Sequence, residues 1–426
     1  VDLVWNGGIG TYIKAESETH LDVGDPSNDS VRVDASVIRA RVLGEGGNLG
    51  VTQRARIEYA LRGGRNNTDA LDNSGGVDMS DREVNLKILL NGAMSAGRLD
   101  LEARNELLEE LTPDVTELVL DDNRSQSLAV TLDEIRAEVG LEDFQQLMLR
   151  LERDGLLDRA DEQLPTWETM SERRSRGQTL VRPELAVLLA YAKLSVKSHV
   201  LDSGLPDDAT IRDYLVRYFP ARAVEVVGDD VLDSHRLRRE IIATQLTNDL
   251  VDLMGAGFVH RMSRETGHAP AEVVRAWLIG ARLSGARELR ESLAEVEADL
   301  SAHVVNRWLL ALARVLERTT RWVLGNVPAD TPMVDVIEEN LEGLATLRGN
   351  FLEVVSGEER DVFQARVEEL QKLTDKYDLA KRLITLRFLD HLLEILRVAR
   401  ESEADPIQVG QAYYRVADRL GVAWLR

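Results

Sequence analysis

The spacing of apolar residues changes along the chain and divides it into a strand-containing part and a helical part. Three short runs near the beginning are typical of buried strands, and each leads into a glycine-rich loop: 1–5 with 6–10, 40–43 with 44–50, and 68–72 with 73–77. Amphipathic patterns typical of helices follow at 52–61 and 80–90. We therefore expect strands whose carboxyl ends carry glycine loops.

From about Leu86 onward, the apolar residues recur at the three- and four-residue spacing of helices. Two stripes are clear: Ile242, Leu246, Leu250 and Met254, and then Val305, Leu309, Leu312 and Leu316. Further helical patterns cover roughly 101–120, 183–200, 270–300, 334–373 and 376–401. The pattern predicts a parallel sheet with helices up to about residue 95 and only helices from about residue 130.

The order strand, crossover, strand, helix, strand is that of half a doubly wound α/β sheet. The predicted fold class is thus α/β plus all-α: the distal half of a Rossmann-like dinucleotide-binding domain, followed by a large helical C-terminal domain. We place the first domain at 1–125 and the second at 126–426. Three strands are too few for a free-standing parallel sheet, which must be covered on both faces, so we expect its other half upstream.

The glycine loops are the candidate ligand site, because ligands of such sheets bind beyond the carboxyl ends of the strands. Glycines allow close approach to the backbone, and a following helix N-terminus offers free N–H groups, so the loops at 44–50 and 73–77 could hold an anion or a nucleotide. Asn48 and Asn73 add amides that suit a ribose hydroxyl or a carboxamide. The alternative for Asn48 is a turn role in a left-handed conformation. No complete Gly-x-Gly-x-x-Gly motif occurs.

Composition excludes several classes of protein. The 426 residues carry a formal charge of −22, which repels nucleic acids and anionic membrane surfaces, and 44% of them are apolar, enough for sizeable cores. There is no cysteine, so disulfides and thiolate chemistry are excluded. The longest apolar run, 185–192, is far shorter than a membrane span, and we find no secretory signal. We expect a cytoplasmic chain that begins within a domain.

Other chemistry-bearing residues have plain structural interpretations. The seven histidines never occur at the three- or four-residue spacing with which one helix face binds a metal, so no metal site is predicted. The cluster at 236–240 is interpreted as a charged helix face, with a subunit contact as the alternative. Trp277, Trp308 and Trp322 are assigned to packing rather than to a ligand cage.

Several longer strings resemble the large bacterial NAD-specific glutamate dehydrogenases. They are Trp-Asn-Gly-Gly-Ile-Gly-Thr-Tyr at 5–12, Gly-Glu-Gly-Gly-Asn-Leu-Gly with Thr-Gln-Arg at 44–54, and Asn-Thr-Asp through Asp-Asn-Ser-Gly-Gly-Val at 67–77. Residues 183–188 and 235–242 resemble the C-terminal domain of that family. The resemblance covers the whole chain.

The resemblance implies oxidative deamination of L-glutamate to 2-oxoglutarate and ammonia, with hydride transfer to NAD. The segment 45–48 is similar to the one beside the nicotinamide ribose, Asn73 to an asparagine near nicotinamide and substrate, and Ser80 to a serine facing the substrate carboxylate. The residues that the resemblance assigns to NAD are Asn6, Gly7, Gly8, Glu45, Gly46, Gly47, Asn48 and Asn73, and those it assigns to substrate are Asn73 and Ser80.

The catalytic lysines, the catalytic aspartate and the phosphate loop of that family have no match in this chain. The resemblance therefore implies the C-terminal part of the enzyme, without catalytic residues of its own and inactive alone, within a homo-oligomer, with a tetramer suspected. The alternative is a non-catalytic helical scaffold for oligomerisation or regulation.

Overall fold

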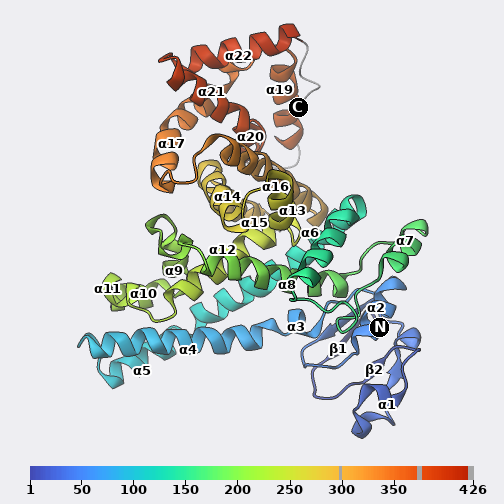
Figure 1. The fold of residues 1–426 in the computed structure, drawn as a ribbon. Coiled ribbons are helices and arrows are strands. Elements are labelled where there is room, and N and C mark those ends of the chain that lie inside the picture. Colours follow the sequence, from blue (N-terminus) through green and yellow to red (C-terminus); the bar gives the residue numbers. More distant parts are fainter. Residues whose placement is uncertain (297–299, 372–376, 421–426) are drawn as a thin grey trace. The chain divides into compact units, whose positions relative to one another are not determined.

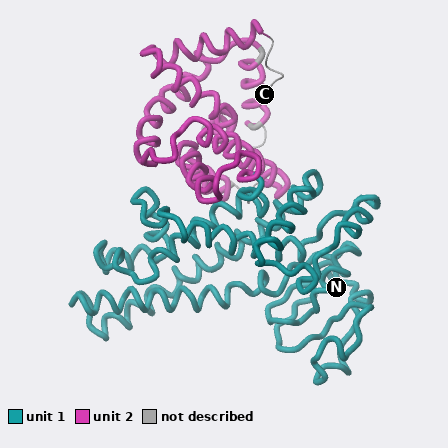
Figure 2. Tube along the Cα trace, in the orientation of Figure 1, with its two compact units in different colours: residues 1–261 teal, residues 262–426 magenta. Residues whose placement is uncertain are grey.

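The structure, a computed structural model, describes residues 1–296, 300–371 and 377–420 (Figure 1). The chain forms two compact units, 1–261 and 262–426 (Figure 2). Each unit is described here by itself. The predicted domain boundary at 125/126 falls inside a long helix, α6 (Thr112–Arg153), and remains a prediction.

The first unit contains both sheets and most of the described helices. Its strands are β1 (Leu3–Asn6), β2 (Ile13–Lys14), β3 (Val33–Asp34) and β4 (Val42–Glu45). Its helices are α1 (His20–Val23), α2 (Gln53–Leu61), α3 (Asp69–Asp72), α4 (Ser74–Ser95), α5 (Leu101–Glu110), α6, α7 (Trp167–Ser175), α8 (Arg182–Leu201), α9 (Asp213–Tyr218), α10 (Ala221–Val227), α11 (Asp229–Asp233) and α12 (Arg238–Met254). Short 3₁₀ turns occur at Pro26–Asn28, Ala35–Val37, Leu205–Asp207 and Ala209–Ile211.

The second unit is helical throughout its described residues. Helix α13 (Phe258–Thr266) contains the boundary between the units. The helices that follow are α14 (Pro270–Ser284), α15 (Ala286–Val296), α16 (Ala302–Asn326), α17 (Met333–Gly349), α18 (Phe351–Val354), α19 (Gly357–Gln371), α20 (Tyr377–Leu386), α21 (Leu389–Glu401) and α22 (Pro406–Leu420).

The two strands predicted first along the chain are present and pair in parallel. β1 and β4 run in register from Leu3 opposite Val42 to Asn6 opposite Glu45. β2 and β3 form a second, shorter parallel pair. Helix α2 packs on this part through Ala55 and Tyr59, which join Leu43 and Val51 in one buried cluster. These pairs are smaller than the sheet that we expected, so the doubly wound architecture stays a prediction.

The third predicted strand is wrong. The chain pairs with β4 only at Arg65, opposite Val42, and then turns into α3 instead of continuing as a strand at 68–72. Thr68 has the extended conformation of a helix N-cap, and acidic Asp69 and Asp72 occupy the short helix that follows. The predicted loop at 73–77 is likewise the first turn of α4. After β4, no strand occurs among the described residues, as predicted for the chain beyond about residue 130.

Both apolar stripes form the buried faces of helices, as predicted. Ile242, Leu246 and Leu250 on α12 are fully buried, and α12 packs against α8 and α6. The stripe at 305–316 lies on α16, which packs against α14. These contacts supply the apolar burial that stabilises helices in water.

Four of the long helical patterns are interrupted, among them the one at 376–401, whose described residues divide into α20 and α21. The pattern at 101–120 divides into α5 and α6 because Pro113 begins a new helix. The pattern at 270–300 breaks at Gly285, whose φ of +65° ends α14 in a left-handed cap. The pattern at 334–373 becomes α17, α18 and α19.

Helix α2 depends on one capping residue, which gives a first prediction. The Thr52 hydroxyl accepts the Ala55 N–H at 3.2 Å, and Thr52 N–H donates to the Ile13 carbonyl at 3.0 Å. We expect Thr52→Ala to lower the free energy of unfolding by about 0.5–2 kcal/mol, measured by urea denaturation. Thr52→Ser, which keeps the hydroxyl, is the control. An equal loss in both variants would assign the effect to the methyl group instead of the cap.

Candidate functional site

Two of the predicted ligand loops meet at one edge of the β1–β4 sheet. Because Asn6 lies opposite Glu45, the loops that follow the two strands begin side by side. The Asn6 carbonyl accepts hydrogen bonds from Gly46 N–H at 2.8 Å and Gly47 N–H at 3.2 Å. The carboxyl ends of the strands therefore hold the loops 6–10 and 44–50 together.

The glycines of the second loop are required by close internal contacts. A Cβ on Gly44 or Gly46 would lie 2.7 or 2.6 Å from the indole ring of Trp5, and one on Gly47 would lie 2.6 Å from the Gly8 carbonyl oxygen. Any larger residue at these positions would displace the ring or the facing loop. The glycines thus position the Trp5 side chain across the loop, in addition to any role in binding a ligand.

The expectation that this loop holds an anion stays a prediction, but several of its N–H groups already have partners. Glu45 N–H donates to Asp72 Oδ2 at 3.0 Å and Leu49 N–H donates to Asp69 Oδ2 at 2.8 Å, while Gly46 and Gly47 donate to Asn6. Two carboxylates of α3 therefore occupy the backbone positions that a phosphate would need. Their negative charge disfavours a bound anion and leaves the edge suited to neutral polar groups.

A buried ion pair fixes the loop to α2. Arg56 donates from Nε to Glu45 Oε2 at 2.7 Å and from Nη2 to Glu45 Oε1 at 2.9 Å, and its Nη2 lies 3.2 Å from Asp69 Oδ1. The Glu45 side chain is only 1% exposed and also accepts Val51 N–H at 3.0 Å. Burial raises the pKa of the Glu45 carboxyl, while the hydrogen bonds from Arg56 act in the opposite direction. Any contact of Glu45 with a cofactor is therefore restricted to its main chain.

The two asparagines singled out in the sequence lie together on the surface. Asn73 Nδ2 donates to Asn48 Oδ1 at 2.5 Å. Within the described part of the chain, Asn48 Nδ2 and Asn73 Oδ1 have no partner, so the pair presents one donor and one acceptor side by side. That combination matches a carboxamide or a pair of ribose hydroxyls.

Helix α6 holds the chain on both sides of Asn73. Asn123 on α6 donates to the Leu71 carbonyl at 3.0 Å and to Ser74 Oγ at 2.9 Å, which holds the junction of α3 and α4. The Asn73 side chain does not cap α4, so it remains directed to the loop. Ser80 is exposed two turns along α4, and its hydroxyl donates to the Gly76 carbonyl at 3.3 Å.

A turn role for Asn48 through a left-handed conformation is wrong. Leu49, and not Asn48, has the positive φ, +59°. Asn6 contributes a further polar group, since its Nδ2 is buried and has no hydrogen-bond partner among the described residues. Such a buried donor without a partner, at the start of the loop 6–10, is compatible with a polar ligand at this edge.

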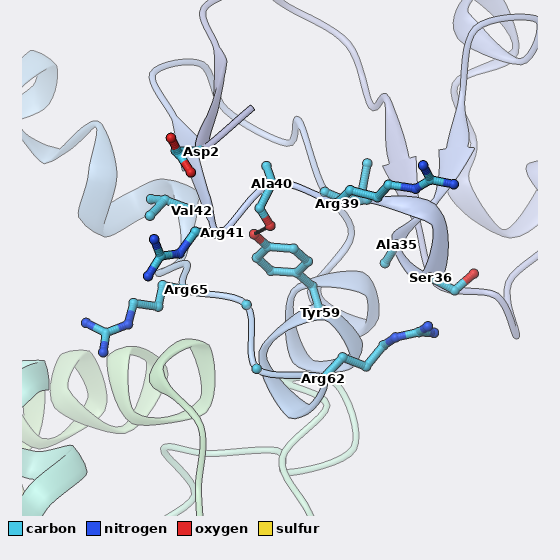
Figure 3. A pocket seen from close by; sticks show the side chains of 13 residues that line it. Asp2, Ala35, Ser36, Arg39, Ala40, Arg41, Val42, Tyr59, Arg62 and Arg65 are labelled. Carbon is cyan, nitrogen blue, oxygen red and sulfur yellow. Dashed lines mark hydrogen bonds between the residues drawn. The ribbon is translucent and has the colours of Figure 1, made fainter.

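A separate pocket of about 840 Å³ lies at the opposite, amino-terminal edge of the same strands (Figure 3). Its floor is Tyr59, whose hydroxyl donates to the Ala40 carbonyl at 2.8 Å. Arg41 and Arg65 extend to one side of Tyr59, and Arg39 and Arg62 to the other. None of the predicted site residues lines this pocket. Arg62 also ends α2, where its backbone N–H donates to carbonyls of the last turn.

The described residues offer neither a metal site nor a membrane span. No group of three or more histidine, aspartate or glutamate side chains there has an arrangement that could hold a metal ion. None of the helices there is both long and apolar enough to cross a membrane.

Sequence reasoning missed the residues that hold the site together. Trp5 and Arg56 were not proposed as functional, and Asp69 and Asp72 were assigned to a strand. One signal was present: acidic residues directly after Thr68 are typical of a helix start. The partners of the loop N–H groups had no local signal, since Asp69 and Asp72 are 20 and 27 residues from the amides whose hydrogen bonds they accept.

Comparison with known proteins gives two matching family models. One, described as "Glutamate dehydrogenase, C-terminal", matches residues 177–426, and the other, described as "Bacterial NAD-glutamate dehydrogenase, catalytic domain", matches residues 1–133. Three curated relatives are each named NAD-specific glutamate dehydrogenase. The identities are 40% over 425 residues in Halomonas elongata, 40% over 428 in Pseudomonas aeruginosa and 38% over 421 in Mycobacterium tuberculosis. These alignments cover 99–100% of this chain and 26% of each relative.

Proposed function

Because the chain belongs to the bacterial NAD-specific glutamate dehydrogenase family, we propose that it is the C-terminal portion of an NAD-dependent glutamate dehydrogenase. The reaction is the oxidative deamination of L-glutamate to 2-oxoglutarate and ammonia, with the hydride accepted by NAD. The chain spans about a quarter of the length of its relatives, so this activity belongs to a longer protein.

The observation that supports this proposal is the exposed pair of Asn48 and Asn73 at the carboxyl ends of β1 and β4. Its free donor and acceptor, together with the buried Nδ2 of Asn6, fit the carboxamide and ribose of the nicotinamide half of NAD. The carboxylates of Asp69 and Asp72, which accept N–H groups of the loop 44–50, disfavour phosphate there. The pyrophosphate of NAD would then be bound by residues outside this chain, in keeping with the missing phosphate loop.

The substrate is proposed to approach along the first two turns of α4. Asn73 lies at the start of this helix and Ser80 about 10 Å further along its axis, at 1.5 Å per residue. Both side chains are neutral hydrogen-bonding groups, so in this proposal they orient glutamate and do not exchange a proton with it. NAD supplies the hydride acceptor when bound.

A scaffold role is the second candidate function, and the helical structure of the second unit, which holds none of the predicted site residues, favours it. None of the predicted site residues lies in 262–426, and the described part of that unit is entirely helical. The two functions are compatible if the second unit joins subunits of a homo-oligomeric enzyme. Native mass spectrometry of the full-length protein with and without residues 262–426 would separate them, because only a scaffold role requires the subunit count to fall.

The test of the cofactor site is Asn48→Ala in the full-length enzyme. We expect the Kd for NAD to rise by about two- to tenfold, since one net hydrogen bond contributes about 0.5–1.5 kcal/mol. The melting temperature should stay unchanged, because Asn48 is exposed and its φ is ordinary. Asn91→Ala, an exposed asparagine further along α4, is the matched control. NAD titration with thermal melts measures both quantities.

Two results would contradict the role of Asn48. Equal NAD affinity in the Asn48→Ala and Asn91→Ala variants would remove the amide from the site. Full affinity in Asn48→Gly would do the same, because glycine offers no amide to the ribose.

A further inference from the structure

A cavity of about 590 Å³ in the second unit is lined mainly by positive charge. It forms where the ends of α14 and α17 meet α20. Its charged lining consists of four cationic side chains and a single carboxylate: Arg282, Arg348, Lys381, Arg382 and Glu288. In a chain with a net charge of −22, acidic side chains outnumber basic ones, so an excess of cations around one cavity is unexpected and needs an explanation.

Arg348 is the central residue of this cluster. Its Nη2 donates to the Leu283 carbonyl at 2.8 Å, at the end of α14. Its Nε is buried and has no hydrogen-bond partner, and no carboxylate among the described residues pairs with it. A guanidinium in this position has lost water without gaining a counter-ion, which costs free energy.

The neighbouring cations increase this cost. Arg382 Nη2 lies within 3.8 Å of where a Cβ on Gly285 would be, so its guanidinium sits over the turn between α14 and α15. Burial and the charge of Arg382 lower the pKa of Arg348 to about 10. Neither Lys381 nor Arg382 forms an ion pair within the described residues.

A purely structural role explains only part of this arrangement. By donating to the Leu283 carbonyl, Arg348 caps the end of α14, a common use of arginine. The cap does not use Nε, and it gives no reason for two further cations on α20. A ligand with at least two negative charges would satisfy Nε and offset the repulsion between Arg348 and Arg382.

We propose that this cavity binds the phosphate group of a small molecule through Arg348, Arg382 and Lys381. The planar guanidinium donates two parallel hydrogen bonds to phosphate oxygens, and the lysine ammonium adds a point charge. The cavity is wider than one phosphate needs, so the group can belong either to free phosphate or to a phosphorylated metabolite. All the residues of the site lie in one unit and are independent of the NAD site.

The experiment uses the 426-residue chain and isothermal titration calorimetry at constant ionic strength. We expect inorganic phosphate to bind and to raise the melting temperature relative to chloride. Arg382→Ala should weaken phosphate binding about tenfold or more, because a hydrogen bond to a charged group is among the strongest in proteins. Arg419→Ala is the matched control, since Arg419 is exposed, lies in the same unit and does not line the cavity.

Arg382 is exposed, so its removal should not unfold the chain, and Arg382→Gln, which keeps most of the stem, provides a second variant. Tighter binding of pyrophosphate or ADP than of phosphate would identify a phosphorylated metabolite as the ligand, and the reverse order would identify free phosphate. The proposal is overturned if phosphate does not bind, or if the Arg382 and Arg419 variants bind it as well as the unmodified chain.

Discussion

Arg56→Met is expected to lower the free energy of unfolding by about 3–5 kcal/mol, because it leaves the Glu45 carboxylate buried without its partner. The Glu45 and Arg56 side chains are 1% and 6% exposed, and two hydrogen bonds of 2.7 and 2.9 Å join them. Asp69 adds a second negative charge near the same guanidinium. Replacing Arg56 therefore also leaves the Glu45 and Asp69 carboxylates near each other without a cation between them. Urea denaturation measures the loss.

A control variant separates the effect of losing the buried ion pair from the effect of losing any arginine side chain on α2 or at its end. Arg62→Met removes a half-exposed arginine whose guanidinium lies 3.8 Å from Glu58, and such a surface pair contributes about 1 kcal/mol or less. The double variant Glu45→Met with Arg56→Met should recover much of the loss, since no unpaired charge remains between these two positions. A loss of equal size in the Arg56 and Arg62 variants would show that the buried pair contributes no more to stability than the surface pair.

The loss of unfolding free energy caused by Arg56→Met should also depend on pH. Burial raises the pKa of Glu45 in the folded chain above its ordinary value of 4.5, and removing Arg56 takes away the group that opposes this shift. A carboxyl with a raised folded pKa binds more protons in the folded state, so stability falls as pH rises above its ordinary pKa. Arg56→Met should therefore be less destabilising at about pH 5 than at about pH 8.

The 426-residue chain alone is expected to form no measurable NADH from glutamate. The side chains that converge at the predicted site, Asn6, Asn48 and Asn73, do not titrate near neutral pH. The nearby carboxylates Glu45, Asp69 and Asp72 already accept hydrogen bonds from Arg56 or from backbone N–H groups. Each missing proton-transfer role typically reduces the rate by about 10²–10⁴.

This second expectation is tested by NADH absorbance, with the full-length enzyme assayed in parallel and an enzyme-free blank. Activity above the blank that Asn48→Ala reduces would place catalytic groups within this chain and contradict the assignment of the lysine and aspartate to a preceding segment. Lys14 would then need a new interpretation first, although it is buried and paired with Asp34.

The parts of the fold that could be predicted are those with a local cause. β1, β4, α2 and the stripes of α12 and α16 follow from apolar period and glycine position, which short segments specify on their own. The segment 68–72 could not be assigned in this way, because its aspartates accept N–H groups of a distant loop, and that tertiary contact favours a helix over a strand. The break at Gly285 was hidden because glycine fits either a helix or a left-handed turn.

The candidate site was predictable in position but not in electrostatics. Two strand ends with glycines and asparagines indicated the edge, and Asn48 and Asn73 do meet there. Whether an N–H group in a glycine loop is free depends on partners far away in sequence, and periodicity carries no information about them. The occupancy of the N–H groups at 45, 46, 47 and 49 therefore could not be predicted from the sequence.

The indole of Trp5 makes three positions of the chain depend on one another during evolution. While the ring covers Gly44 and Gly46, a side chain at either glycine would force the ring to move, so substitution at both positions is disfavoured. A smaller residue at position 5 would open them, and it would have to arise first. We therefore expect substitutions at this edge to be ordered, with loss of the tryptophan preceding variation at either glycine.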